Sequence, residues 1–187
     1  MNLSQEAKRL KLEKDKVKIA AYKQLTEEVF ELRDFNNHAL AALDKTTALL
    51  LLNPEFYTIW NYRREILLEL INTNSDSQRL LNEDLKLVMS ILKRFPKCYW
   101  IWNHRRWCLF ELVKIGTVDW NYEFAVVSKL LLLDARNFHG WQYRRFVVEN
   151  IEKSVVDAPE VPPDQEKLQL LDINVTEFNF TTSKINS

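Results

Sequence analysis

Three side chains that could bind an anion occupy neighbouring positions of two similar stretches of the sequence. Lys97 and Tyr99 belong to KCYWIWNHRR, and His139 belongs to NFHGWQYRR. An ammonium, a phenol and an imidazole can each donate a hydrogen bond to a phosphate or carboxylate oxygen. If these residues stand at the N-terminal ends of helices, free backbone N–H groups add further donors and a positive partial charge. The pattern predicts a small anion site, although an exposed lysine and a tyrosine at the core edge would give the same pattern.

These side chains lie within an internal repeat. The segments NPEFYTIWNYRR (53–64), FPKCYWIWNHRR (95–106) and DARNFHGWQYRR (134–145) align without gaps over twelve positions. Each contains an aromatic residue, a tryptophan three residues later and then an arginine pair, and the tryptophans are 42 and then 39 residues apart. A period near 40 residues is typical of stacked supersecondary units. We therefore expect an all-α protein, a right-handed superhelical stack of helical hairpins.

The tryptophan and the second arginine of each repeat fall on one stripe of a helix. We interpret this stripe as structural, because a periodic feature belongs to a framework more often than to a site that occurs once. Each tryptophan would be largely buried between helices, and each arginine would lie along it and pair with a carboxylate or helix-end carbonyls. The predicted stripe consists of Trp60, Arg64, Trp102, Arg106, Trp141 and Arg145.

The chain is expected to form one α–α repeat domain, truncated at its end. Pro54 and Pro96 suit the first turn of the second helix of their hairpins, and Asn53 and Asp134 suit N-caps there. Residues 177–185 resemble the start of the third repeat, so we expect a piece of a longer array. The expected parts are an N-terminal helix (1–36), repeats at 37–73, 77–115 and 118–153, a proline-rich acidic loop (154–166), and the first helix of an incomplete fourth repeat (167–187).

Composition excludes several classes of function. The 26 basic and 26 acidic residues give a formal net charge of zero, which leaves no global electrostatic footprint for nucleic acid. Two glycines are too few for a glycine-rich phosphate loop, and no apolar run approaches the roughly 18 residues that span a membrane. Two cysteines make no disulfide framework, which predicts a cytoplasmic protein. Cys98, His104 and Cys108 could face one another, but buried structural cysteines are the simpler interpretation, and no metal site is predicted.

The twelve-residue segments closely resemble the repeats of protein prenyltransferase α subunits, and the resemblance covers about residues 17–187. In that family, hairpins with a P-x-x-Y-x-x-W-x-x-R-R core stack into a crescent around a β subunit. The pattern D-x-R-N-F-H-x-W-x-Y-R-R-x-V at 134–147 resembles the α subunits of Rab geranylgeranyltransferases (type II), and the short arrangement with few domains is similar to the fungal members. The α subunit shared by farnesyltransferase and geranylgeranyltransferase type I is the nearest alternative. A non-catalytic scaffold of the tetratricopeptide kind is less similar, because its usual period is about 34 residues.

The resemblance implies an enzyme subunit that is inactive alone. With a prenyltransferase β subunit, which would hold a zinc ion, it would transfer geranylgeranyl from geranylgeranyl diphosphate to C-terminal cysteines of Rab GTPases presented by an escort protein. No cofactor is expected in this chain. Lys97 and Tyr99 match α-subunit residues that reach the isoprenoid diphosphate, and His139 matches a residue beside that site, so these three are predicted to be catalytic. Asn137 fits the neighbouring motif position and is predicted to bind substrate.

Overall fold

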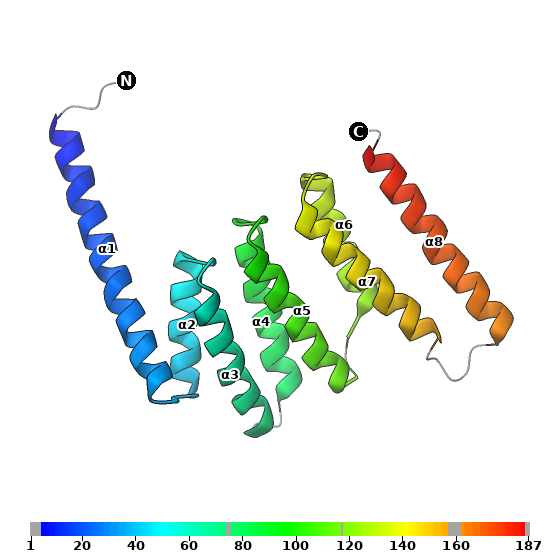
Figure 1. Ribbon diagram of the computed structural model, residues 1–187, viewed down its shortest axis with the longest axis horizontal. Helices are drawn as coiled ribbons and strands as arrows, with labels where there is room; N and C mark the ends of the chain where they lie inside the picture. Colours follow the sequence, from blue (N-terminus) through cyan, green and yellow to red (C-terminus); the bar gives the residue numbers. More distant parts are fainter. Residues whose placement is uncertain (1–4, 74–75, 117, 157–161, 186–187) are drawn as a thin grey trace. The chain divides into compact units, whose positions relative to one another are not determined.

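The computed structural model describes residues 5–73, 76–116, 118–156 and 162–185, and their regular secondary structure is entirely α-helical. No helix in these ranges is long and apolar enough to cross a membrane. The all-α prediction is therefore confirmed. The helices are α1 (Gln5–Asp34), α2 (Leu40–Leu52), α3 (Tyr57–Thr73), α4 (Ser77–Leu92), α5 (Tyr99–Lys114), α6 (Trp120–Leu133), α7 (Phe138–Val156) and α8 (Pro163–Ile185) (Figure 1).

The chain divides into two compact units, Met1–Ile115 and Gly116–Ser187. In the first unit, each of the helices α1 to α5 packs on the next along the chain, and α3 also contacts α5. In the second unit, α7 packs against both α6 and α8. Of the expected loop at 154–166, residues 157–161 lie outside the described residues, and α7 and α8 occupy part of the remainder. Three helical hairpins, α2–α3, α4–α5 and α6–α7, therefore carry the three repeats.

The second helix of each hairpin begins at the aromatic residue of the repeat, after a tight turn. Pro54 lies in the turn before α3, so the expectation of a proline inside the first helical turn is corrected. The side chains of Asn53 and Asp134 close these turns instead of capping the helices. The Oδ1 atom of Asn53 accepts the Glu55 N–H at 3.2 Å, and that of Asp134 accepts the Arg136 N–H at 3.1 Å. Asparagine and aspartate commonly stabilise turns in this way.

The repeat tryptophans fasten these turns to the helices that follow. The indole N–H of Trp60 donates to Pro54 O, that of Trp102 to Pro96 O, and that of Trp141 to Ala135 O, each at 2.8 Å. Trp60 and Trp102 are buried as expected, whereas Trp141 is half-buried. A tryptophan suits this position because its ring fills the space between helices while its single N–H donor reaches a backbone carbonyl of the preceding turn.

The buried arginine of each pair is the first, not the second. Arg63 and Arg144 are enclosed, with exposures of 4% and 0%. In contrast, Arg64 is half-buried, and Arg106 and Arg145 are exposed. The first arginine is enclosed because it faces the helices on both sides of its own helix, as its contacts show.

Arg63 illustrates these contacts. Its Nη1 group donates to Leu43 O, Thr46 Oγ1 and Thr47 Oγ1 of α2, while its Nε and Nη2 groups pair with Asp84 of α4. One arginine of α3 therefore connects three consecutive helices.

Arg144 of α7 does the same in the second unit. It donates to Ser128 Oγ of α6 at 2.7 Å and to both carboxylate oxygens of Glu177 in α8 at 2.8 Å. Its guanidinium also lies over the rings of Phe124 and Phe180, at 4.2 and 3.7 Å from their centroids. The first arginine of a repeat therefore holds successive helices in register in both units.

Candidate functional site

Lys97 and Tyr99 flank the residue from which α5 starts. Cys98 is the N-cap of this helix, with an extended backbone, and Tyr99 is the first helical residue. Lys97 is exposed, and Tyr99 is 46% exposed. Both side chains therefore stand at the N-terminal end of α5, where the helix dipole favours negative charge.

Cys98 itself belongs to the framework. Its thiol is buried and donates to Pro54 O at 3.3 Å, the carbonyl that also accepts the Trp60 indole N–H. Burial raises the pKa of Cys98 to about 11, so the group is a thiol at neutral pH. This contact ties the start of α5 to the turn before α3 and so fixes the position from which Lys97 and Tyr99 project.

Aromatic side chains form the surroundings of Tyr99. The ring of Trp100 lies 5.2 Å from that of Tyr99 in an edge-on arrangement and 5.3 Å from that of Tyr57, centroid to centroid. Tyr57 begins α3 as Tyr99 begins α5, and it is 53% exposed. Stacked repeats thus bring equivalent positions of α3 and α5 side by side, and Trp100 limits the directions that the Tyr99 ring can take.

His139 and Asn137 lie at the start of α7, in the second compact unit. Asn137 is buried, and its Oδ1 atom accepts the N–H of Gly140 at 3.2 Å, which is the bond of an N-cap residue. His139 is half-buried in the first helical turn, and its ring lies 5.8 Å from that of Phe138. The structure therefore places these two predicted site residues at a helix N-terminus, as it does Lys97 and Tyr99, each pair within its own unit.

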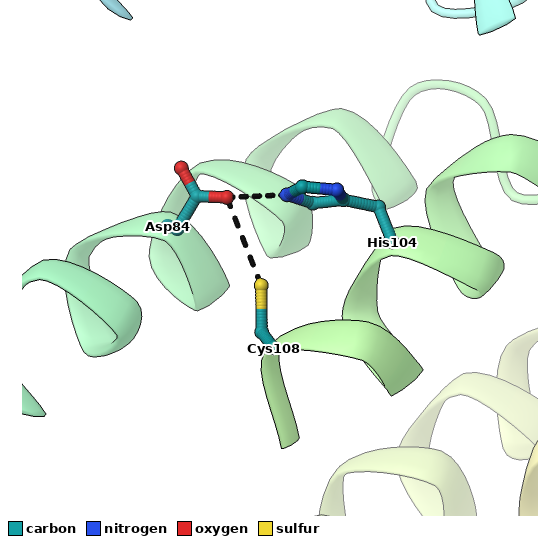
Figure 2. Close-up of side chains that lie close together, drawn as sticks. All are labelled: Asp84, His104 and Cys108. Atoms are coloured by element: carbon teal, nitrogen blue, oxygen red, sulfur yellow. Dashed lines mark hydrogen bonds and ion pairs between the residues drawn. The ribbon is translucent and has the colours of Figure 1, made fainter. Parts of the chain in front are cut away.

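A second group of chemically active side chains is buried inside the first unit. Figure 2 shows Asp84 of α4 facing His104 and Cys108 of α5, with one carboxylate oxygen in contact with both. One carboxylate oxygen of Asp84 lies 2.5 Å from Nε2 of His104 and accepts from the Cys108 thiol at 3.7 Å. One ligand atom of each residue lies within 4.8 Å of the others, a spacing that a metal ion could bridge. Sequence reasoning grouped Cys98 with His104 and Cys108 but missed Asp84.

The charges around this cluster fit an ion-pair network better than a metal site. The other oxygen of Asp84 is already paired with the Arg63 guanidinium. Burial acts to raise the pKa of Asp84, but the charge of Arg63 and the hydrogen bond from His104 outweigh it and hold that pKa well below its ordinary value. Burial raises the pKa of Cys108, and the charge of Asp84 adds to this, so Cys108 is a neutral thiol. A divalent metal needs a thiolate and would be repelled by the adjacent guanidinium.

The repeats and their helical fold match one class of protein. The family described as "Protein prenyltransferase alpha subunit repeat" matches residues 39–70, 81–112 and 120–151, which correspond to the three hairpins. This chain belongs to that family. The resemblance of the repeated segments is therefore confirmed.

Individual relatives narrow the class further. The geranylgeranyl transferase type-2 subunit alpha of Candida albicans is 58% identical over 99% of this chain and 49% of its own length. The protein of the same name from Saccharomyces cerevisiae is 42% identical, over 98% of this chain and 51% of its own length. The chain thus spans about half the length of these curated relatives, and the similarity to fungal type II α subunits is confirmed.

A solved structure agrees with the fold. It is described as Candida albicans protein geranylgeranyltransferase-I complexed with GGPP, and it superposes with a TM-score of 0.64 at 26% identity. The match covers 88% of this chain and 52% of that chain. The helical hairpin stack is therefore shared with a prenyltransferase of known structure.

Proposed function

We propose that this chain is part of the α subunit of a type II protein geranylgeranyltransferase. With a β subunit, the enzyme would transfer geranylgeranyl from its diphosphate to C-terminal cysteines of Rab GTPases presented by an escort protein, in the cytoplasm. The observation that carries this proposal is the exposure of Lys97 and Tyr99 at the start of α5, in a chain most of whose length aligns with type-2 α subunits.

The chemistry assigned to these residues is stabilisation of the leaving group. As the bond between the isoprenoid carbon and the diphosphate oxygen breaks, negative charge grows on the diphosphate. The Lys97 ammonium and the Tyr99 hydroxyl would donate to those oxygens, and the N–H groups at the start of α5 would add to the favourable potential. Donors that are already in place before the reaction act most strongly on such a developing charge.

The second unit would contribute His139 as a further donor. Its imidazole stands in the first turn of α7 and is half-buried, so part of the side chain is accessible. Asn137 is buried, and its carbonyl oxygen is engaged by the Gly140 N–H, so it would act on the substrate mainly by fixing the start of α7. The nucleophile is a thiolate, and a zinc ion held by the β subunit would supply it by lowering the thiol pKa.

The α subunit of farnesyltransferase and geranylgeranyltransferase type I is the second candidate. The structural match to a type I enzyme favours it. Its sequence identity of 26% is well below the 58% shared with a type-2 α subunit, so type II remains our proposal.

Single-turnover prenyl transfer tests the role of Lys97. In the full-length subunit assembled with its β subunit, Lys97→Ala should slow transfer on the order of 10²-fold, because a preorganised donor to the developing charge is lost. Tyr99→Phe should slow it less, since only a hydroxyl is removed. Lys86→Ala, at an exposed lysine of α4, is the matched control and should transfer at the wild-type rate. A wild-type rate for Lys97→Ala with an intact heterodimer would contradict the proposal.

A further inference from the structure

We propose that Asn103 is a positioning residue for Tyr99. The Asn103 side-chain NH2 group donates to the Tyr99 hydroxyl oxygen. The hydroxyl hydrogen therefore points away from Asn103 and can be donated to an anionic ligand at the start of α5. This inference rests on the proposed function, because it assigns a cause to the orientation of a group that the function uses.

Asn103 and Tyr99 are in contact along one face of α5. They are four residues apart, which places one above the other on a helix, and Asn103 Nδ2 lies 3.4 Å from Tyr99 Oη. An amide can present either its oxygen or its NH2 group to a hydroxyl, so the direction of this bond depends on what holds the other end of the amide.

Arg64 of α3 holds that other end. Its Nη2 group lies 2.5 Å from Asn103 Oδ1. A guanidinium only donates, so the amide oxygen must face Arg64 and the NH2 group must face Tyr99. The phenol oxygen of Tyr99 is therefore the acceptor, and its own hydrogen points in another direction.

Buried groups fix the position of Arg64. Its Nε group donates to His104 Nδ1 at 3.3 Å, which requires the imidazole to carry its hydrogen on Nε2. That hydrogen is donated to Asp84 Oδ2 at 2.5 Å. Burial lowers the pKa of His104 despite the neighbouring Asp84, which agrees with a neutral imidazole in this arrangement. A continuous series of hydrogen bonds thus runs from the buried carboxylate of Asp84 to the hydroxyl of Tyr99.

The three repeats differ at the positions concerned. In α3 the equivalent pair is Tyr57 and Asn61, and Asn61 is exposed. In α7 the pair is Phe138, which has no hydroxyl, and the exposed Gln142. The half-buried amide that contacts an exposed tyrosine hydroxyl therefore belongs to the repeat that also carries Lys97.

Asn103→Asp reverses the bond with almost no change in size. A carboxylate has no hydrogen to donate, so it would accept from Arg64 and also from the Tyr99 hydroxyl, which would turn inward. In the full-length α/β enzyme, single-turnover geranylgeranyl transfer by Asn103→Asp should fall by about the same factor as by Tyr99→Phe, on the order of tenfold. Asn61→Asp makes the same chemical change at the matching exposed position and should leave the rate unchanged.

The double variant separates positioning from a general structural effect. Adding Asn103→Asp to Tyr99→Phe should cause no further loss, because no hydroxyl remains to be turned. An equal loss in both backgrounds would overturn the inference, and so would a wild-type rate for Asn103→Asp beside a slow Tyr99→Phe. Asn103→Ala releases the hydroxyl without reversing its direction, so its transfer rate should lie between those of wild type and Asn103→Asp. If Asn103→Asp proves unstable in a thermal melt, Asn103→Ala takes its place in the test. If Lys97→Ala and Tyr99→Phe both transfer at the wild-type rate, the proposed function fails as well.

Discussion

At the scale of single residues, the ion pair between Arg63 and Asp84 is enclosed on all sides, with side-chain exposures of 4% and 1%. Two charges removed from water contribute little net free energy while paired, but either one alone in the same place is costly. The carboxylate also accepts from His104 and from the Cys108 thiol, so its loss would remove the acceptor of donors on three residues. Asp84 is therefore the residue of this network whose removal should be most damaging.

Asp84→Ala should lower the free energy of unfolding by about 3–5 kcal/mol, because the Arg63 guanidinium is left buried and unpaired. Urea unfolding of the full-length subunit, followed by circular dichroism, measures the change. Glu83→Ala is the control, because the neighbouring Glu83 is exposed and should contribute almost nothing. Equal midpoints for the two variants would show that the pair is unimportant for stability.

The buried imidazole of His104 predicts a pH dependence. Burial lowers its pKa below the ordinary value of 6.5, so between the two values the unfolded chain binds more protons than the folded chain. Stability from this group is present above about pH 6.5 and should decline as the pH falls below it. Thermal melts from pH 7.5 to pH 5.5 should show a falling midpoint, with a smaller fall in His104→Asn. The same slope in both proteins would contradict this assignment.

Residue identities in the buried network were only partly predictable. The repeat predicted that one arginine of each pair would bind a carboxylate. Helical spacing favoured the second arginine of the pair, which is Arg64 in the first repeat. The structure buries the first position, because residue 63 faces both α2 and α4. A signal was available: Glu177, which pairs with Arg144, matches Glu123 in the internal repeat. Asp84 carried the same signal, because Asp84 and Glu123 each stand 18 residues before the tryptophan of their repeats, Trp102 and Trp141. The match was not extended to the second repeat.

At the scale of secondary-structure elements, each hairpin depends on the bond between a tryptophan and the turn before its helix. The bond joins residues six positions apart, and its length is the same in all three repeats. Aromatic size alone would be met by phenylalanine, so the recurrence of tryptophan is explained by its donor. The turn that carries Lys97 is one of those fixed in this way.

Trp60→Phe should therefore lower the free energy of unfolding by about 2 kcal/mol or more. The causes are lost packing and the loss of the hydrogen bond to the Pro54 carbonyl. The measurement is the thermal midpoint of the full-length subunit. Trp107→Phe, at a half-buried tryptophan of α5, should cost clearly less. If both variants had the same thermal midpoint, the indole hydrogen bond would not explain why tryptophan recurs in the three repeats.

The elements themselves were well predicted, but their exact starts were not. The repeat period and the spacing of apolar residues reflect whole helices, so they predicted the hairpins. The start of each second helix depends on the turn, where Asn53 and Asp134 bond within the turn instead of to the helix. Capping and turn formation use the same side chains, so sequence could not separate them. Lys97 and Tyr99 are exposed at a helix start, as expected from the sequence, and their catalytic role stays a prediction.

At the scale of the molecule, the two compact units carry different parts of the predicted site. The first unit holds Lys97 and Tyr99, and the second holds His139 and Asn137. Within each unit, the pair stands at the start of the second helix of a hairpin. The proposed function places the zinc ion in a β subunit, so we expect activity to require that partner.

Pairing with that partner tests the central claim most directly. The tagged full-length α subunit should be produced with a type II β subunit and, separately, with a farnesyltransferase or type I β subunit. We predict that only the type II partner co-purifies in equal amount, that this complex transfers geranylgeranyl to a Rab GTPase with its escort protein, and that the α subunit alone transfers none. A stable, active complex with the farnesyltransferase or type I partner instead, or transfer by the α subunit alone, would contradict the account.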